Sequence, residues 1–215
     1  MTFEAVVFDL DGVIVQSEEI WDDVREGYVR EQGGRYDAEA QRAMMGMSSL
    51  EWSQFIHDEL GVAAPPAEIN AAVVELMAAR YRERLPIVGG ACEAVALMAA
   101  RFPLGLASSS NRPLIDTVLE LAGLTALFSA TVSSEEVAQG KPAPDVFLEV
   151  ARRLGIDPER CLAVEDSHNG IRSARAAGMR VIAIPNPSYP PDDTALAEAD
   201  LVLMSISELT PEIVL

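Results

Sequence analysis

The chain has 215 residues, with 34 acidic against 16 basic side chains and a formal net charge of −18. This charge argues against a nucleic-acid partner, because a basic face supplies most of the affinity for nucleic acid. The length suits one large domain or a domain with an insertion. The apolar stretches are short and interrupted, so we expect no membrane partner either.

The sequence also indicates a compartment. The segment MTFEAVVFDLDG lacks the basic region and the small-residue cleavage site of a signal peptide. Cys92 and Cys161 are too few and too isolated for a disulfide framework. We therefore expect a cytoplasmic, reduced setting, and a monomer or a weak dimer.

The first part of the chain combines one strand with a helical region. The apolar run over 5–8 predicts a buried strand. Ser17, followed by two glutamates, is typical of a helix N-terminus. Apolar residues then recur at helical spacing as far as residue 84, with glycine and proline breaks and no evident strand. The helices predicted in this region span 18–31, 38–45, 49–60 and 66–84.

After residue 86 helices and strands alternate, which indicates a parallel sheet with helices on both faces. The strands are continuous apolar runs, as expected when both of their faces are covered. The predicted helices span 91–101, 113–122, 144–154 and 169–177, and the strands 104–107, 130–133, 161–164, 181–184 and 201–203. We therefore predict an α/β fold, with a doubly wound parallel sheet core formed by 1–15 and 86–215 and an all-helical cap inserted at 16–85.

Polar side chains follow the predicted strands at one edge of the sheet. Each alone has an ordinary explanation as a turn, a helix cap or a solvated residue. Ligands of open parallel sheets, however, bind at the carboxyl ends of the strands, where these groups would meet. Strand by strand they are Asp9 and Asp11; Ser108, Ser109, Ser110 and Asn111; Lys141; and Glu165, Asp166 and Ser167.

The two aspartates of the first strand end predict phosphoryl chemistry. Side chains two residues apart on a strand point to the same side, so Asp9 and Asp11 can reach one phosphorus atom. Asp9 would attack it as a nucleophile, and Asp11 would serve as general acid and then general base. Carboxylates around a phosphate repel it, which calls for a cation, and Mg²⁺ prefers carboxylate oxygens. We expect its ligands to be Asp9, the backbone carbonyl of Asp11, and Asp166, with Glu165 in support.

The remaining groups are expected to bind the phosphoryl oxygens. Ser108 would donate a hydrogen bond to one of them, assisted by the Ser109 N–H at the start of a helix. Lys141 is the only lysine in a chain that otherwise uses arginine. A compact ammonium suits a position beside a phosphate, where it would neutralise charge on the phosphoryl group and on Asp9.

Together these motifs resemble the haloacid dehalogenase-like hydrolase superfamily, in the subgroup with a helical cap between the first two motifs. The resemblance covers essentially the whole chain. It implies a Rossmann-like core, a Mg²⁺ cofactor and a phosphatase that acts on a small phosphorylated metabolite such as a sugar phosphate. The matching segments are DLDGV at 9–13, LASSSN at 106–111, GKPAPD at 140–145 and VEDS at 164–167.

The cap residues bear on the alternative, a sugar phosphomutase similar to β-phosphoglucomutase. Trp21 stands where the mutase pattern has a histidine that helps to time proton transfer. Ser49 stands where that pattern has an arginine that holds the distal phosphate. Both departures favour hydrolysis. The residues expected to contact the substrate or the cap are Ser17, Trp21, Gly46, Met47, Ser48 and Asn111.

A non-enzymatic alternative is the phosphoacceptor receiver domain, which also combines acidic groups, a hydroxyl and a lysine on a parallel sheet. Its acceptor aspartate lies on an internal strand and it has no cap. Here the D-x-D run lies at residue 9 and a helical region follows it, so we reject this interpretation.

Overall fold

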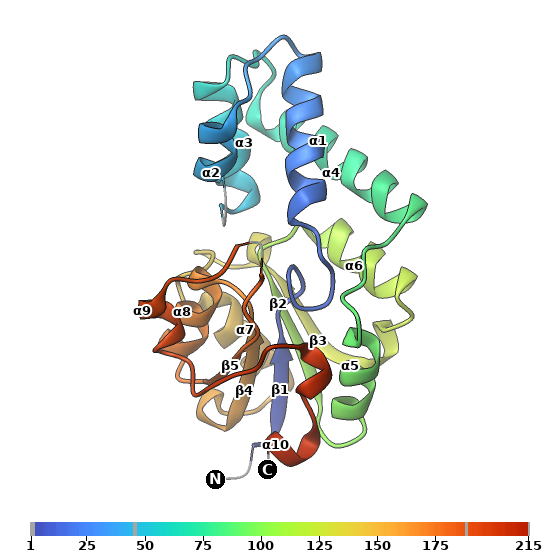
Figure 1. Cartoon of the computed structure of the whole chain (residues 1–215), viewed down its shortest axis with the longest axis vertical. Helices are drawn as coiled ribbons and strands as arrows, with labels where there is room; N and C mark the ends of the chain where they lie inside the picture. The colour runs from blue at the N-terminus through green and yellow to red at the C-terminus, as the bar shows by residue number, and fades with distance from the viewer. Residues whose placement is uncertain (1–2, 45–46, 188, 215) are drawn as a thin grey trace.

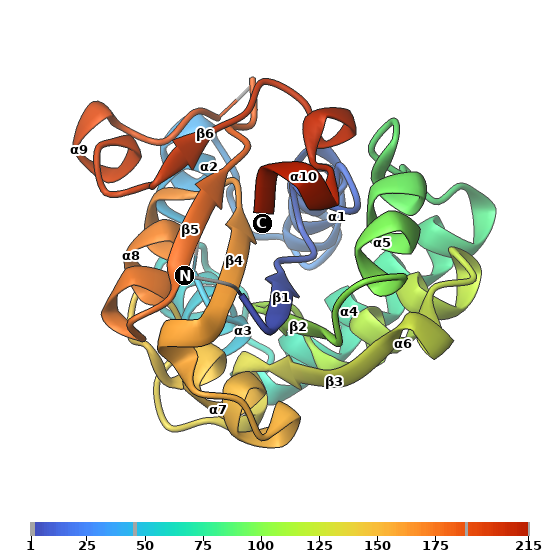
Figure 2. The same ribbon diagram turned by 90° about the horizontal axis from the view of Figure 1, so that it is seen from below.

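The computed structural model describes residues 3–44, 47–187 and 189–214, and in this part of the chain one sheet organises the fold. Its six strands are parallel and lie in the order β3-β2-β1-β4-β5-β6, as Figure 2 shows from below. This confirms the predicted doubly wound, Rossmann-like sheet. The strands are β1 (Ala5–Phe8), β2 (Leu104–Ser108), β3 (Phe128–Ser133), β4 (Cys161–Glu165), β5 (Arg180–Ala183) and β6 (Leu201–Val202).

Alternate residues of the strands face two separate apolar clusters. Val6 and Phe8 belong to the cluster that contains α5 (Ala91–Ala99) and α6 (Arg112–Leu121). Ala5 and Val7 belong to the cluster that contains α7 (Asp145–Leu154) and α8 (His168–Ala176). Both faces of the sheet are therefore covered, which explains why its strands are apolar on both sides.

The four helices predicted between residues 16 and 85 are present and gather at one end of the molecule (Figure 1). They are α1 (Glu18–Glu31), α2 (Ala38–Met44), α3 (Ser49–Glu59) and α4 (Pro66–Glu83). The two chain segments that join them to the sheet pair with each other. The Gln16 N–H donates a hydrogen bond to the Pro86 carbonyl at 2.8 Å, and Val15 and Ile87 form an antiparallel β-bridge. The predicted domain boundaries fall at this crossing, and the division into domains remains a prediction.

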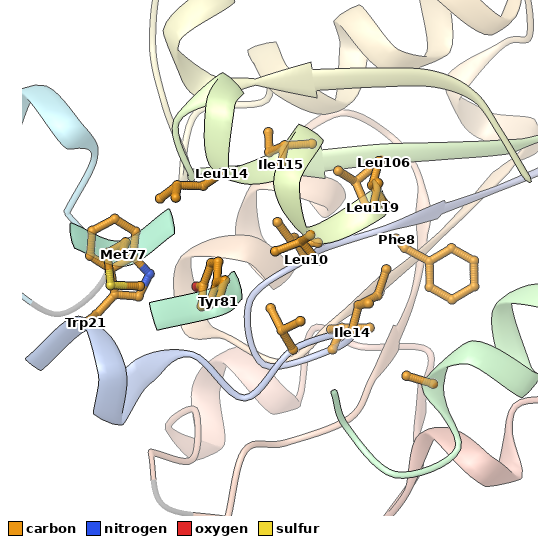
Figure 3. Packing of buried hydrophobic residues seen from close by; sticks show 14 of the residues in the cluster. Phe8, Leu10, Ile14, Trp21, Met77, Tyr81, Leu106, Leu114, Ile115 and Leu119 are labelled. Atoms are coloured by element: carbon orange, nitrogen blue, oxygen red, sulfur yellow. The ribbon is translucent and has the colours of Figure 1, made fainter. Parts of the chain in front are cut away.

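The apolar cluster of the α5–α6 face continues into the helical region. Figure 3 shows it running from Trp21 of α1 and Met77 and Tyr81 of α4 to Leu10 and Phe8 beside the sheet. Met77 is fully buried and Tyr81 almost so. This packing holds α4 against α6, so the helical region and the sheet share one core along that side.

The chain after β5 contains elements that periodicity did not predict. These are the short helices α9 (Asp193–Leu196) and α10 (Pro211–Val214). Both have four residues, too few for an apolar period to be visible in the sequence. Within the described residues, the structure contains no helix with the length and apolar character that crossing a membrane would require.

Gly105 provides a test of the packing between β2 and α7. A Cβ atom there would lie 2.3 Å from Cγ1 of Val150, so we expect Gly105→Ala to lower the free energy of unfolding by about 1–3 kcal/mol. The matched control is Gly27→Ala at an exposed position of α1, where an added Cβ meets nothing within 4 Å. That change should raise the free energy of unfolding by about 0.5–1 kcal/mol. Urea denaturation measures both, and equal stabilities of the two variants would contradict this packing.

Candidate active site

Lys141 lies at the centre of the predicted site and joins three neighbouring strands. Its Nζ donates to Oδ1 of Asp9 at 2.6 Å, to Oε1 of Glu165 at 2.5 Å and to the carbonyl of Ala107 at 3.0 Å. Asp9 follows β1, Ala107 belongs to β2 and Glu165 ends β4. The side chains of Lys141, Asp9 and Glu165 are 4%, 7% and 0% exposed. These are therefore buried ion pairs, which water screens little.

Glu165 is held on both of its oxygens. While Oε1 accepts from Lys141, Oε2 accepts from the backbone N–H groups of Asp166 and Ser167 and from the Ser167 hydroxyl. Gly170 on α8 permits this arrangement, because a Cβ there would lie 1.9 Å from the Glu165 carboxyl carbon. Glu165 therefore holds the ammonium of Lys141 in place.

Asp166 completes an acidic cluster at the same edge. One carboxylate oxygen each from Asp9, Glu165 and Asp166 can be chosen so that all lie within 4.8 Å of one another. Gly12, with φ +84°, lies directly beside Asp166, and a Cβ there would come within 1.8 Å of Oδ2. The glycine of the D-x-D-G segment is therefore required both by its left-handed backbone and by the close approach of Asp166.

The cluster carries more negative than positive charge. Burial raises the pKa of Asp9 to about 8, and Glu165 and Asp11 add to the rise while Lys141 opposes it. Burial, followed by the charges of Glu165 and Asp9, raises the pKa of Asp166 well above its ordinary value. Three buried carboxylates meet one ammonium here, so a divalent cation with oxygen ligands fits this donor set.

Asp11 is oriented by serines from two loops. Ser17 donates to its Oδ1 at 2.5 Å, and Ser110 donates to its Oδ2 at 2.7 Å. Sequence reasoning assigned no role to Ser110, although it stands two residues beyond Ser108 on the same strand end. Ser108 is fully buried, and its hydroxyl accepts the Ser110 N–H and lies 3.5 Å from Oδ2 of Asp11. The Ser17 contact connects the start of the helical region with the D-x-D segment.

A cleft of about 350 Å³ opens over this cluster. Asp9, Asp11, Lys141 and Asp166 line its floor together with Ser109, as the strand-end rule predicts. A further wall comes from the proline-rich segment after β5, to which the sequence analysis assigned no role. The residues of that wall are Asn186, Tyr189, Pro190, Pro191 and Asp192. Because the segment follows a strand at the same edge, the rule that located the other groups could have found it.

The predicted cap residues lie in different settings. Trp21 is buried against Trp52, with ring centroids 6.0 Å apart. Met47 lines a smaller pocket of about 70 Å³. Ser48 caps α3 and exchanges hydrogen bonds with Glu51. Gly46 lies outside the described residues.

Asn111, which follows β2, links the sheet to the helical region. Its Nδ2 donates to Oδ1 of Asn70 on α4 at 3.2 Å and to Oε1 of Glu135 at 2.7 Å. Asn111 also lines the smaller pocket. The structure therefore brings Asn111 and Met47 to the same small pocket, and their contact with a substrate stays a prediction.

The fold and the acidic site define a hydrolase of known type. The family model described as haloacid dehalogenase-like hydrolase matches residues 3–178. The chain belongs to this family, and the predicted enzyme class, a phosphatase of the family, is confirmed at that level.

Named relatives share the family. Hexitol phosphatase B of Escherichia coli K12 is 34% identical over 96% of this chain and 94% of its own length. The bifunctional riboflavin kinase/FMN phosphatase of Arabidopsis thaliana is 32% identical over 96% of this chain, which spans about half (54%) of that protein's length. The crystal structure of CbbY from Rhodobacter sphaeroides in complex with phosphate superposes with a TM-score of 0.86 at 28% identity, covering 97% of this chain and 96% of that one.

The raised pKa of Asp9 gives a testable pH dependence of stability. A carboxyl whose folded pKa of about 8 exceeds its ordinary value of 3.8 stabilises the fold at low pH, and this contribution is lost as the pH rises toward 8. We therefore expect the melting temperature, measured in EDTA, to fall between pH 5.5 and 8.5. The fall should be smaller in Asp9→Asn, which lacks this carboxyl. Identical slopes in both proteins would contradict the assignment.

Proposed function

We propose that the protein is a Mg²⁺-dependent phosphomonoesterase that acts on a small phosphorylated metabolite, such as a sugar phosphate, through an aspartyl phosphate on Asp9. The observation that carries this proposal is the buried contact of Lys141 with Asp9 beneath a cleft that Asp11 also lines. The names of the relatives support the substrate class, since they include a hexitol phosphatase and a structure with bound phosphate.

The geometry suggests how Asp9 acts. Lys141 occupies Oδ1, so we assign attack on phosphorus to Oδ2. The new bond joins Oδ2 to phosphorus as the ester bond to the leaving oxygen breaks, and Lys141 stabilises the charge that develops on the phosphoryl group. Glu165 orients Lys141 for this task, which we propose as its role in place of direct metal binding.

Asp11 handles the protons in both halves of the reaction. It first donates a proton to the leaving oxygen, and the resulting carboxylate then takes a proton from the water that attacks the phosphoryl group. Phosphate leaves and Asp9 is restored. The hydroxyls of Ser17 and Ser110 can serve as donors or acceptors, so they can support Asp11 in either protonation state.

The acidic cluster supplies the place for the metal ion. Asp9, Asp166 and the backbone carbonyl of Asp11 would hold Mg²⁺, which supplies positive charge to the phosphoryl oxygens when bound. Gly12 leaves the room that Asp166 needs at this position.

Replacement of the nucleophile tests the mechanism. Asp9→Asn should lower the turnover of p-nitrophenyl phosphate by roughly 10³-fold or more, because an amide cannot form the acyl phosphate. Asp116→Asn on the exposed side of α6 is the matched control and should keep full activity. Circular dichroism checks that both variants fold. Turnover retained by folded Asp9→Asn would defeat the mechanism.

A sugar phosphomutase would use the same aspartyl phosphate but return the group to a sugar hydroxyl. We expect hydrolysis, because Trp21, which stands where the mutase pattern has a histidine, packs against Trp52 and its ring cannot exchange a proton with the substrate. With β-glucose 1-phosphate and a glucose bisphosphate activator, the protein should release inorganic phosphate in step with substrate loss. Conversion to glucose 6-phosphate with little free phosphate would establish the mutase instead.

A further inference from the structure

Arg25 on α1 lies beside the candidate active site without a protein anion to pair with. Its guanidinium stacks over Trp21 at 4.6 Å and over Trp52 at 5.1 Å from the ring centroids. Its Nε is buried and has no hydrogen-bond partner. Among the described residues, no ion pair includes Arg25, whereas Arg30 on the same helix pairs with Glu26.

The neighbouring carboxylates are engaged elsewhere or lie too far away. Asp22 accepts a hydrogen bond from the Tyr36 hydroxyl at 2.5 Å. Asp11 accepts hydrogen bonds from the hydroxyls of Ser17 and Ser110. Burial lowers the pKa of Arg25, and the charge of Glu18 opposes that shift without forming an ion pair with the guanidinium. A partly buried arginine that remains charged is costly without an anion, so its position beside an open pocket requires a reason.

Arg25 lines the smaller pocket, which adjoins the catalytic cleft. Asp11, Glu18 and Ser109 line both the cleft and this pocket, so the two are neighbouring parts of one site. The volume of about 70 Å³ accommodates one small group rather than a whole metabolite. The pocket also includes Asn111, whose Oδ1 is buried without a partner while its Nδ2 is fixed by two hydrogen bonds.

These two groups specify complementary chemistry in a ligand. The guanidinium of Arg25 presents donors for an oxyanion, and Oδ1 of Asn111 presents an acceptor for a hydroxyl. The faces of Trp21 and Trp52 fix the plane of the guanidinium, so little side-chain entropy remains to be lost on binding. A phosphorylated, hydroxylated metabolite with a second anionic group would meet both groups.

We propose that Arg25 determines substrate specificity by binding an anionic group, phosphate or carboxylate, at the end of the substrate away from the transferred phosphoryl group. The Oδ1 atom of Asn111 accepts a hydrogen bond from a hydroxyl group of the same substrate. This inference rests on the proposed function, because the transferred phosphoryl group lies at Asp9. It narrows the substrate class from any sugar phosphate to those with two anionic groups.

Matched substrates measure the contribution of the second anion. 3-Phosphoglycerate is compared with glycerol 3-phosphate, and fructose 1,6-bisphosphate with fructose 1-phosphate, so that one pair adds a carboxylate and the other a phosphate. The readout is the ratio of kcat/KM within each pair. For the wild type we expect a ratio well above one in at least one pair, and that pair identifies the anion. A ratio of one or less in both pairs would overturn the proposal.

The variants test whether Arg25 causes the preference. Arg25→Met retains contact with the indole rings but loses the charge, and should lower the ratio by about 30- to 100-fold, as expected for a charge-assisted contact. Arg25→Lys keeps the charge and should retain part of the preference. Arg30→Met, on the same helix but exposed, is the control and should leave the ratio unchanged. Equal losses for both members of a pair, or an unchanged ratio in Arg25→Met, would refute the role.

A binding measurement separates this inference from the proposed function. Trp21 and Trp52 are the only tryptophans in the chain, so intrinsic fluorescence reports on the surroundings of Arg25. In the Asp9→Asn background, fructose 1,6-bisphosphate should cause a saturable change at concentrations about 30-fold lower than fructose 1-phosphate, and Arg25→Met should abolish the difference. If no substrate releases phosphate, the proposed function fails, whereas equal affinities for the two sugars would refute the role of Arg25.

Discussion

The ammonium of Lys141, buried between Asp9 and Glu165, is the interaction on which the rest of the site depends. It joins the ends of β1, β2 and β4, which are adjacent strands in the sheet. A buried ion pair is worth its desolvation only when the geometry is good and the remaining hydrogen bonds are made. Here Glu165 has both oxygens satisfied, and Gly170 leaves room for its carboxylate. The glycine at position 170 therefore serves the ion pair of Lys141, because it leaves room for the carboxylate that binds the ammonium.

The same arrangement leaves the site short of positive charge. Burial raises the pKa values of Asp9 and Asp166, and the neighbouring carboxylates add to the rise because one lysine cannot neutralise them all. An apolar cluster of the same size would be more stable. The divalent cation of the proposed function would supply the missing positive charge. The fold thus gives up stability where ligand binding can restore it.

The sequence predicted those parts of the site that depend on strand ends, because a strand end has a fixed place in a parallel sheet. Asp9, Lys141, Glu165 and Asp166 meet as that rule requires. Groups whose position depends on packing between distant segments were not predicted. Arg25 is one of fifteen arginines, and nothing in its local sequence shows that Trp52, from another helix, lies beneath it. The limit is one of tertiary contact, since helical spacing identifies neighbours within α1 but not those across the cap.

The structure changes which residues bear on the choice between water and a sugar hydroxyl as the phosphoryl acceptor. The serine at position 49 suggested hydrolysis because a distal cation was missing from that loop, and Ser49 is indeed buried in α3. Arg25 on α1 places a cation over Trp52, which belongs to the same helix as Ser49, so the absence of an arginine at 49 no longer separates the two reactions. Proton transfer separates them better. Trp21 is packed against Trp52, and Nδ1 of His57 is engaged by the carbonyls of Val62 and Ala64. Trp21 therefore cannot replace the histidine of the mutase pattern. We expect Asp11 to activate the acceptor, and water needs no second group to orient it.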